Sequence, residues 1–205
     1  MNKTVIGVLA SGRGSNLQAI IDAIQAGRLN AKIGVVISDN PEANVLKRMA
    51  GVDIQAVCID RRLFAGRREF EAAVAEELAL HHVELVVLAG FMRILSQYFI
   101  DRFAGRIMNI HPSLLPAFPG ENAQQQALAY GVKVAGCTVH FVDAGMDTGP
   151  IILQEAVPVL GDDTVETLSE RILHAEHILY PRALALYCEG RLTSAGRHIH
   201  IVDKE

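Results

Sequence analysis

Long apolar runs, basic stripes and closely spaced cysteines are all missing from this sequence of 205 residues. No stretch approaches the roughly 18 apolar residues of a membrane span, so we expect no membrane-spanning segment. The 19 basic and 23 acidic residues are interspersed, and their net charge of −4 argues against nucleic acid as a partner. Cys58, Cys137 and Cys188 are odd in number, far apart and without metal-ligand spacing, which is typical of reduced thiols in an intracellular protein.

The N-terminal segment MNKTVIGVLASGRGS also lacks the pattern of a signal peptide. Its apolar run is only about seven residues long and no small-residue cleavage pattern comes after it, so we interpret it as a first strand. We therefore expect a cytoplasmic protein without a membrane partner or a metal site.

The first half of the chain alternates short apolar runs with amphipathic segments. Runs rich in β-branched residues predict strands at 4–10, 33–38, 54–59 and 85–89. Helical spacing predicts helices from about residue 15, at 43–50 and at 67–81. Strands that alternate with helices predict an α/β fold, with a Rossmann-like, mostly parallel sheet and helices on both faces.

The second half has a different rhythm. It predicts a short strand at 106–108, a helix at 122–130, an antiparallel pair of strands at 134–142 and 150–159, and a polar, irregular tail from Leu192. A long helix after the pair would be capped by Asp163, with Glu166 three residues further on. Because no linker or repeat interrupts the chain, we predict one domain over 1–205, with parts at 1–105 and 106–190 and a tail at 191–205.

A glycine-rich turn, SGRGSNLQ, joins the first strand to the first helix. The spacing of Ser15 and Gln18 predicts a capping box, and Gly12 and Gly14 allow a tight turn with exposed N–H groups that would bind an anion such as a phosphate. A plain strand-to-helix turn is the alternative. A dinucleotide site is less favoured because Leu17 breaks the fingerprint, although Asp39 keeps a nicotinamide cofactor open.

The loop Gly90–Leu95 comes after the fourth strand at the edge where open α/β sheets bind ligands. It is apolar except for Arg93, which would suit a flat heteroaromatic ligand with polar edges. The alternative is that Phe91, Met92, Ile94 and Leu95 are core residues below a loop.

Asn109 and His111 stand two residues apart in an extended segment, so their side chains face the same side. An amide donor and a protonated imidazole at one point would stabilise an oxyanion, although a lone histidine is more often structural. Pro112, Pro116 and Pro119 stiffen the segment after His111, as a site of fixed geometry requires. The sequence leaves open whether the bond before Pro116 is cis.

Asp147 lies in the glycine-rich turn GMDTGP. A carboxylate near His111 would favour the imidazolium form and keep it a proton donor, whereas the alternative is an ordinary turn aspartate. His140 is interpreted as a packed or supporting residue. No serine or cysteine stands in a nucleophile elbow, which argues against a covalent mechanism.

Several motifs together resemble the folate-dependent phosphoribosylglycinamide (GAR) formyltransferases over nearly the whole chain: SGRGSNLQAIIDA, LAGFMRILS, NIHPSLLPAFPG, GCTVHFVDAGMDTGPIILQEAVPV and AEHILYP. The NIHPSLLP segment alone would indicate only the wider fold, which also serves methionyl-tRNA formyltransferase and formyltetrahydrofolate hydrolase. We expect a further domain in each of those two, and 205 residues do not hold one.

The resemblance implies a role for each matching residue. Catalysis would fall to Asn109, His111 and Asp147. GAR would be bound by Gly14, Ser15, Asn16 and Glu176. Folate would be bound by Arg67, Met92, Arg93, Ile94, Leu95 and Asn109, and by the loop residues Val142, Asp143, Ala144, Gly145, Met146 and Asp147.

Two positions depart from the family pattern. Gln124 stands where members often have histidine, and Leu173 stands where some have lysine. Both positions belong to substrate binding, so they bear on GAR affinity and not on the reaction.

The resemblance therefore implies transfer of the formyl group of 10-formyltetrahydrofolate, as co-substrate, to the amine of GAR in de novo purine biosynthesis. The partners would be these two small molecules, with the protein a monomer or a homodimer. The alternatives are a formyltetrahydrofolate hydrolase, a nicotinamide-dependent oxidoreductase and a non-catalytic nucleotide-binding regulator.

Overall fold

The computed structural model describes residues 2–203, so Met1 and residues 204 and 205 of the predicted domain and tail lie outside the described residues. Two compact units make up the chain, the first ending at Met108 and the second beginning at Asn109. The single domain stays a prediction. Among residues 2–203, none of the helices is both long enough and apolar enough to cross a membrane.

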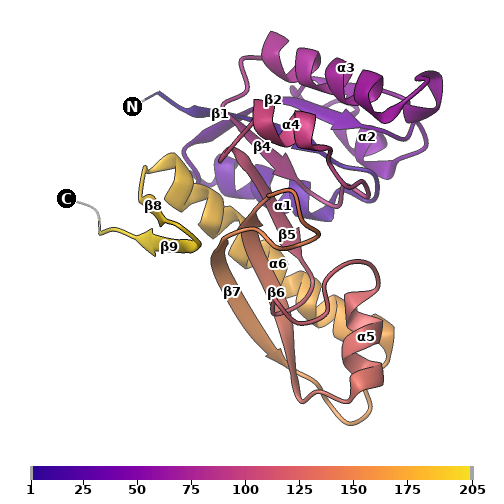
Figure 1. Ribbon diagram of the computed structural model, residues 1–205, viewed down its shortest axis with the longest axis vertical. Helices are drawn as coiled ribbons and strands as arrows, with labels where there is room; N and C mark the ends of the chain where they lie inside the picture. Colours follow the sequence, from indigo (N-terminus) through magenta and orange to yellow (C-terminus); the bar gives the residue numbers. More distant parts are fainter. Residues whose placement is uncertain (1, 204–205) are drawn as a thin grey trace. The chain divides into compact units, whose positions relative to one another are not determined.

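Seven strands form one sheet in the order β3-β2-β1-β4-β5-β6-β7 (Figure 1). Their bounds are β1 Thr4–Leu9, β2 Ala31–Ser38, β3 Ala56–Cys58, β4 Leu85–Leu88, β5 Ile107–His111, β6 Val134–Phe141 and β7 Ile151–Pro158. β1 pairs in parallel with β2 and β4, β2 pairs in parallel with β3, and β6 and β7 are antiparallel. The predicted mostly parallel α/β sheet with an antiparallel pair is confirmed.

Helices connect these strands in the predicted places. They are α1 Ser15–Gln25, α2 Asn44–Met49, α3 Arg67–Leu80, α4 Gln97–Arg102, α5 Ala123–Tyr130 and α6 Val165–Cys188, with a 3₁₀ turn η1 at Arg61–Leu63. Among the helices of residues 2–203, α4 and η1 were not predicted; the three residues of η1 are too few to show a helical period. β4 is buried along its whole length, which explains its unbroken apolar sequence.

The start of α1 differs from the prediction in its cap. Gly14 is the N-cap and adopts a left-handed conformation, with φ 75°. In the described chain no side chain caps this helix, so the capping box predicted from Ser15 and Gln18 is wrong. The side chain of Gln18 instead donates to Asp22 one turn further on, at 2.8 Å.

The start of α6 is also capped differently. Thr164 is the N-cap, and its side chain and that of Thr167 form a capping box, so the predicted Asp163 cap is wrong. Asp163 accepts hydrogen bonds from both terminal nitrogens of Arg171, at 2.7 and 2.9 Å, which hold the pKa of its carboxyl well below the usual value. Arg171 therefore binds the Asp163 carboxylate that the sequence predicted to cap the N-terminus of α6.

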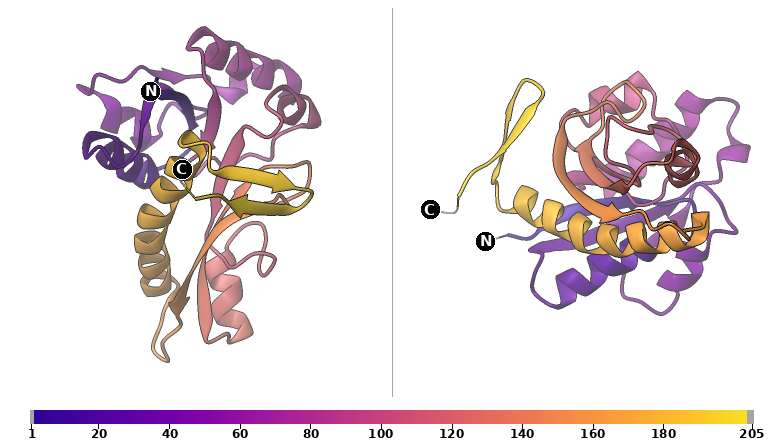
Figure 2. Two further views of the ribbon diagram at one scale, coloured as in Figure 1. Left: turned by 90° about the vertical axis from the view of Figure 1, so that its left-hand side faces the viewer. Right: turned by 90° about the horizontal axis from the view of Figure 1, so that it is seen from below.

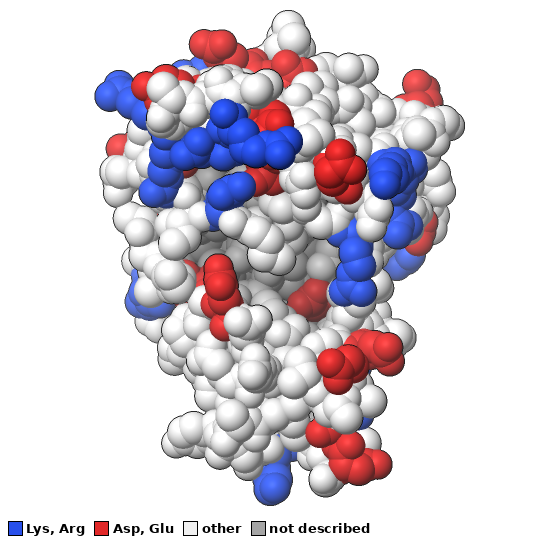
Figure 3. Space-filling view, turned by 90° about the vertical axis from the view of Figure 1, so that its right-hand side faces the viewer, with Lys and Arg blue, Asp and Glu red and all other residues white. Residues whose placement is uncertain are grey.

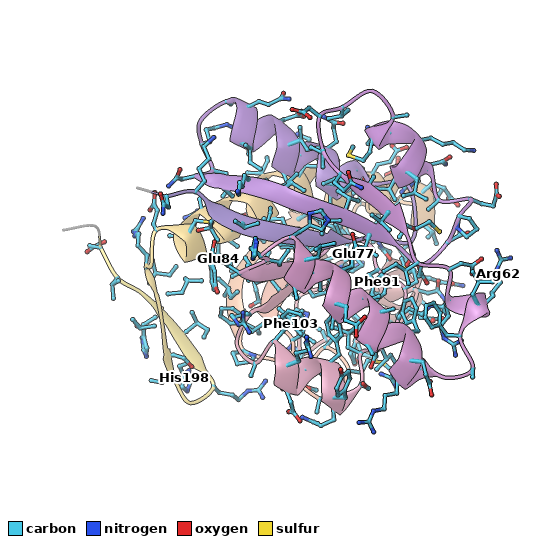
Figure 4. The ribbon with its side chains drawn as sticks, turned by 90° about the horizontal axis from the view of Figure 1, so that it is seen from above. Arg62, Glu77, Glu84, Phe91, Phe103 and His198 are labelled. Atoms are coloured by element: carbon cyan, nitrogen blue, oxygen red, sulfur yellow. The ribbon has the colours of Figure 1, made fainter. Side chains whose placement is uncertain are left out.

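The C-terminal segment is a hairpin and not the predicted irregular tail. β8 (Leu192–Ala195) and β9 (His198–Ile201) pair antiparallel, with Gly196 at φ 62° in the turn (Figure 2). Its residues are largely exposed, so it lacks the buried apolar face by which a strand is recognised. Figure 4 labels His198 at the start of β9. β9 lies near β7 within the second unit.

Candidate active site

The carboxyl ends of β5 and β6 and the loop after β6 bring four polar side chains together in the second unit. His111 Nδ1 lies 3.3 Å from Asp147 Oδ2, and Asn109 Nδ2 lies 3.3 Å from His140 Nε2. Asn109 and His111 lie inside β5, which is longer than the predicted strand 106–108 because the buried Ile110 continues it. The structure therefore places the three predicted catalytic residues in one cluster, and adds His140 to it.

The ring of His111 has an acceptor at each nitrogen. Nε2 lies 2.9 Å from the carbonyl oxygen of Phe118, which can only accept, so this nitrogen carries a hydrogen. Nδ1 faces the carboxylate of Asp147, which also accepts. The contact of Nδ1 with Asp147 is an ion pair only when the ring is protonated, and the residue is 4% exposed, so water cannot easily replace either partner.

His140 has the opposite character. Burial lowers the pKa of its imidazole, which favours the neutral ring. Nδ1 donates to the Phe141 carbonyl at 2.8 Å, so Nε2 carries the lone pair and accepts from the Asn109 amide. The approach of Nε2 to Asp147 Oδ1, at 3.8 Å, is therefore not an ion pair. His140 fixes the direction of the Asn109 side chain.

A buried threonine holds the proline-rich segment after His111. Thr138 Oγ1 donates to Ser113 O at 2.7 Å and accepts from Leu115 N and Gln154 Nε2 at 3.0 and 2.9 Å. Gln154 also donates to Leu115 O, and the peptide bond between Leu115 and Pro116 is cis. Sequence reasoning missed Thr138 and Gln154, because one polar residue in a strand carries no sign of its partner.

The loop after β6, residues 142–149, contains all six of its predicted folate-binding residues. Asp143 Oδ1 accepts from Gly145 N and from Thr148 Oγ1, at 3.1 and 2.6 Å. Asp147 adopts φ 54° and its Oδ2 accepts from Gly120 N at 2.8 Å. The loop is therefore shaped by its own carboxylates, one of which also faces His111.

The glycine turn of the first unit leads directly into α1. A side chain at Gly14 would collide with Val45, and its left-handed backbone also requires glycine. The first turn of a helix leaves N–H groups without intrahelical partners, which suits an anion beside Ser15 and Asn16. Leu17 is fully buried, as a core residue should be. Their roles in GAR binding, and that of the buried Glu176 on α6, stay predictions.

The loop after β4 divides between surface and core. Met92 and Ile94 are exposed, so the alternative of a fully packed loop is wrong for them, whereas Leu95 is buried. Arg93 Nε donates to Asp39 Oδ2 at 2.7 Å, and Met92 N donates to Ser11 Oγ at 3.0 Å. The bond from Arg93 occupies one carboxylate oxygen of Asp39, the residue on which the nicotinamide alternative rested. Figure 4 labels Phe91 in this loop.

A buried glutamate anchors the end of the same loop. Glu71 on α3 is 2% exposed and accepts from Ser96 N at 2.8 Å, from Arg67 Nε at 3.1 Å and from Ser96 Oγ. Arg67 also donates to Ile94 O. The structure thus joins two sets of predicted folate-binding residues through a glutamate that sequence reasoning missed. Its position among Phe70 and Val74, on the apolar face of α3, was the available signal.

Gln124 and Leu173, the two departures from the family pattern, lie on helices of the second unit. Gln124 on α5 and Leu173 on α6 are both half-buried, and their effect on GAR affinity stays a prediction. On the face shown in Figure 3, acidic and basic side chains lie among larger uncharged areas. Among residues 2–203, no group of three or more histidine, cysteine or acidic side chains is arranged to hold a metal ion.

Comparison with known proteins places this geometry in a family. Residues 4–184 match the formyl transferase family. The chain belongs to that family. The phosphoribosylglycinamide formyltransferase of Bacillus subtilis is 45% identical over 177 residues, which is 86% of this chain and 91% of that protein. This formyl transferase therefore groups with the phosphoribosylglycinamide formyltransferases, as the motifs predicted.

Solved structures of the formyl transferase family have the same fold. Glycinamide ribonucleotide transformylase 1 from Symbiobacterium toebii is 53% identical, with a TM-score of 0.96 over 98% of this chain and 95% of that one. The trifunctional purine biosynthetic protein adenosine-3 of Chironomus tentans is 47% identical over 190 residues, or 92% of this chain. The chain spans only 14% of the length of that larger protein.

Proposed function

We propose that this protein transfers the formyl group of 10-formyltetrahydrofolate to the amine of GAR, in the cytoplasm, giving formyl-GAR and tetrahydrofolate for IMP synthesis. The cluster of His111, Asp147 and Asn109 at the end of β5 is the observation that carries the proposal. The relative from Bacillus subtilis supports the choice of substrates, because the alignment covers nearly all of its length.

The reaction begins when the GAR amine attacks the formyl carbon. A carbon–nitrogen bond forms, and the formyl oxygen becomes an oxyanion. His111 and Asn109 stabilise this charge: the Asn109 amide has a second N–H besides the one given to His140, and the oxyanion competes with the Phe118 carbonyl for the Nε2 hydrogen of His111. Asp147 balances the imidazolium at 3.3 Å.

The tetrahedral intermediate then collapses. The oxyanion re-forms the carbonyl, the bond to the N10 atom of the folate breaks, and the proton released by the amine ends on that nitrogen. No covalent enzyme intermediate is needed, because both substrates are bound together and the amine is already a nucleophile.

Each substrate has its own set of binding residues in this proposal. Gly14, Ser15 and Asn16 hold the GAR phosphate, with Glu176 as a further contact to the same substrate. Arg67, the loop 92–95 and the loop 142–147 hold the folate. The exposed Met92 and Ile94 support this assignment, since an apolar side chain left on a loop can contact a flat ring.

A formyl transfer assay with and without GAR tests the proposal. Tetrahydrofolate should appear only when GAR is present, in equal amount to formyl-GAR, with no release of formate. Formate released without GAR would identify a hydrolase, in which water attacks in place of the amine. Saturable nucleotide binding without turnover would identify a regulator.

A further inference from the structure

The C-terminal hairpin reaches the loop that carries Asp147. Arg197, in the turn between β8 and β9, donates from Nη2 to the backbone carbonyl of Thr148 at 2.8 Å. Thr148 is the next residue after Asp147 in the chain. A segment about fifty residues away is therefore hydrogen-bonded to the Thr148–Gly149 peptide group, one residue beyond the aspartate whose carboxylate faces His111.

The hydrogen bonds within the loop and from Gly120 hold the Gly145 amide and the side chains of Thr148 and Asp147, whereas Arg197 holds the Thr148 carbonyl. Asp143 holds Gly145 N and the Thr148 hydroxyl, and Gly120 N holds the Asp147 side chain. Asp147 itself adopts φ 54°, a left-handed conformation that non-glycine residues adopt at some cost. A bond to the Thr148 carbonyl restrains the Thr148–Gly149 peptide plane. Because Thr148 follows Asp147 directly, this restraint also limits the backbone of Asp147 and so the direction of its side chain.

The hairpin is suited to carry such a bond. Its strands pair along their length, β9 lies near β7, and Arg191 closes its base by donating to Val202 O at 2.7 Å. Arginine presents several donors in a rigid plane, so it can hold a carbonyl in a defined direction. The hairpin thus provides a stable support outside the loop itself.

We propose that Arg197 is a positioning residue for Asp147, and that the C-terminal hairpin supports the loop 142–149 in its active geometry. The proposal rests on the proposed function, because it assigns Asp147 to formyl transfer. In this proposal Arg197 acts through the Thr148 carbonyl and not through contact with a substrate.

The test is a double-mutant cycle in the formyl transfer assay. Arg197→Ala should lower kcat about 2- to 10-fold, the range expected for one hydrogen bond. It should raise the KM of the folate and leave the KM of GAR unchanged. Arg197→Lys, which keeps a charged donor, should recover part of the loss. In an Asp147→Asn background, Arg197→Ala should change kcat by less than about 2-fold.

The control is His198→Ala, an exposed residue of the same hairpin, which should match the native protein. Thermal denaturation of every variant checks that the fold is intact. An equal loss of kcat in both backgrounds, or no loss in the native background, overturns the proposal, because a general loss of structure would act independently of Asp147.

Hydrogen exchange separates failure of this proposal from failure of the proposed function. Arg197→Ala should speed exchange of the amides in residues 145–149 relative to His198→Ala, whatever reaction the protein catalyses. If the native protein transfers formyl groups and the cycle shows no coupling, only the role of Arg197 fails. If the native protein shows no transfer, the proposed function fails, and unchanged exchange would then reject the support by the hairpin as well.

Discussion

The two units use their carboxylates in different ways. In the first unit, Asp39 and Glu71 are almost fully buried and accept hydrogen bonds from Arg93 and Arg67, which hold the loop after β4. In the second unit, Asp147 accepts from Gly120 N and faces the imidazole of His111. Arginine keeps its proton under all ordinary conditions, whereas imidazole exchanges one near neutral pH.

The partner of each carboxylate decides whether it holds a loop in place or takes part in the reaction. A carboxylate paired with arginine can fix the path of a loop but cannot change charge during a reaction. A carboxylate paired with histidine can favour the imidazolium form, which donates to an oxyanion that forms and then collapses. We therefore expect substitutions in the first unit to affect stability and binding, and substitutions in the second unit to affect turnover.

Among substitutions in the second unit, Asp147→Asn should cause the largest fall in kcat. It removes the negative charge beside His111 and keeps the size and the left-handed backbone, which asparagine tolerates. We expect kcat to fall by about 10²- to 10⁴-fold, because His111 loses the counter-charge that favours its donor form, with the melting temperature nearly unchanged. Asp162→Asn, an exposed aspartate in the turn before α6, is the control. Near-normal turnover would remove Asp147 from the mechanism.

Asn109→Ala should be the next largest. In the proposed mechanism it removes the amide donor to the oxyanion, and it leaves His140 Nε2 without the Asn109 amide. Loss of one oxyanion donor lowers kcat by about 10²- to 10³-fold. Steady-state kinetics beside Gln125→Ala, an exposed residue of α5, would measure it. A rise in KM with kcat unchanged would instead assign Asn109 to binding alone.

Glu71→Gln tests the first unit. The buried carboxylate loses its charge, and one oxygen that accepted from Ser96 or Arg67 becomes an amide donor. We expect the free energy of unfolding to fall by about 1–3 kcal/mol, measured by urea denaturation, and the KM of the folate to rise. Glu76→Gln, exposed on the same helix, should change neither. A large loss of kcat without loss of stability would break the division between the units.

The pH dependence of stability should give the smallest effect. Because burial lowers the pKa of His140, the unfolded chain binds a proton there that the folded chain does not. The free energy of unfolding should therefore fall as the pH drops below about 6.5, by at most about 1.4 kcal/mol per pH unit from this residue. His140→Gln should reduce that slope between about pH 7.5 and 5.5. An identical slope in both proteins would argue that His140 has the same pKa in the folded and unfolded states.

Much of the fold can be predicted from local patterns in the sequence. The apolar runs of β1 and β4 and the stripe of α6 indicate buried elements because burial requires many apolar residues at a fixed period. The spacing of Asn109 and His111 indicates a shared side because alternate residues of a strand face the same way. Both inferences use neighbours along the chain.

The parts that sequence reasoning missed depend on distant partners. Thr164 caps α6 in place of the predicted Asp163, whose carboxylate binds Arg171. Thr138 and Glu71 support the site through bonds to the backbone of segments distant in the sequence. The hairpin β8–β9 was missed because its strands are exposed on most sides. Such features become visible only when three-dimensional contacts are known.

Gly149 limits how the protein could be redesigned. A side chain at this position would collide with the carbonyl oxygen of Phe141, and one at Gly145 would collide with the Thr148 hydroxyl. If the proposed folate-binding role of the loop 142–149 is correct, a library for new formyl donors could vary this loop. Randomising the whole loop would yield mostly variants in which it cannot form. Keeping both glycines fixed and varying Ala144 and Met146 would leave the loop able to form while its contact surface changes.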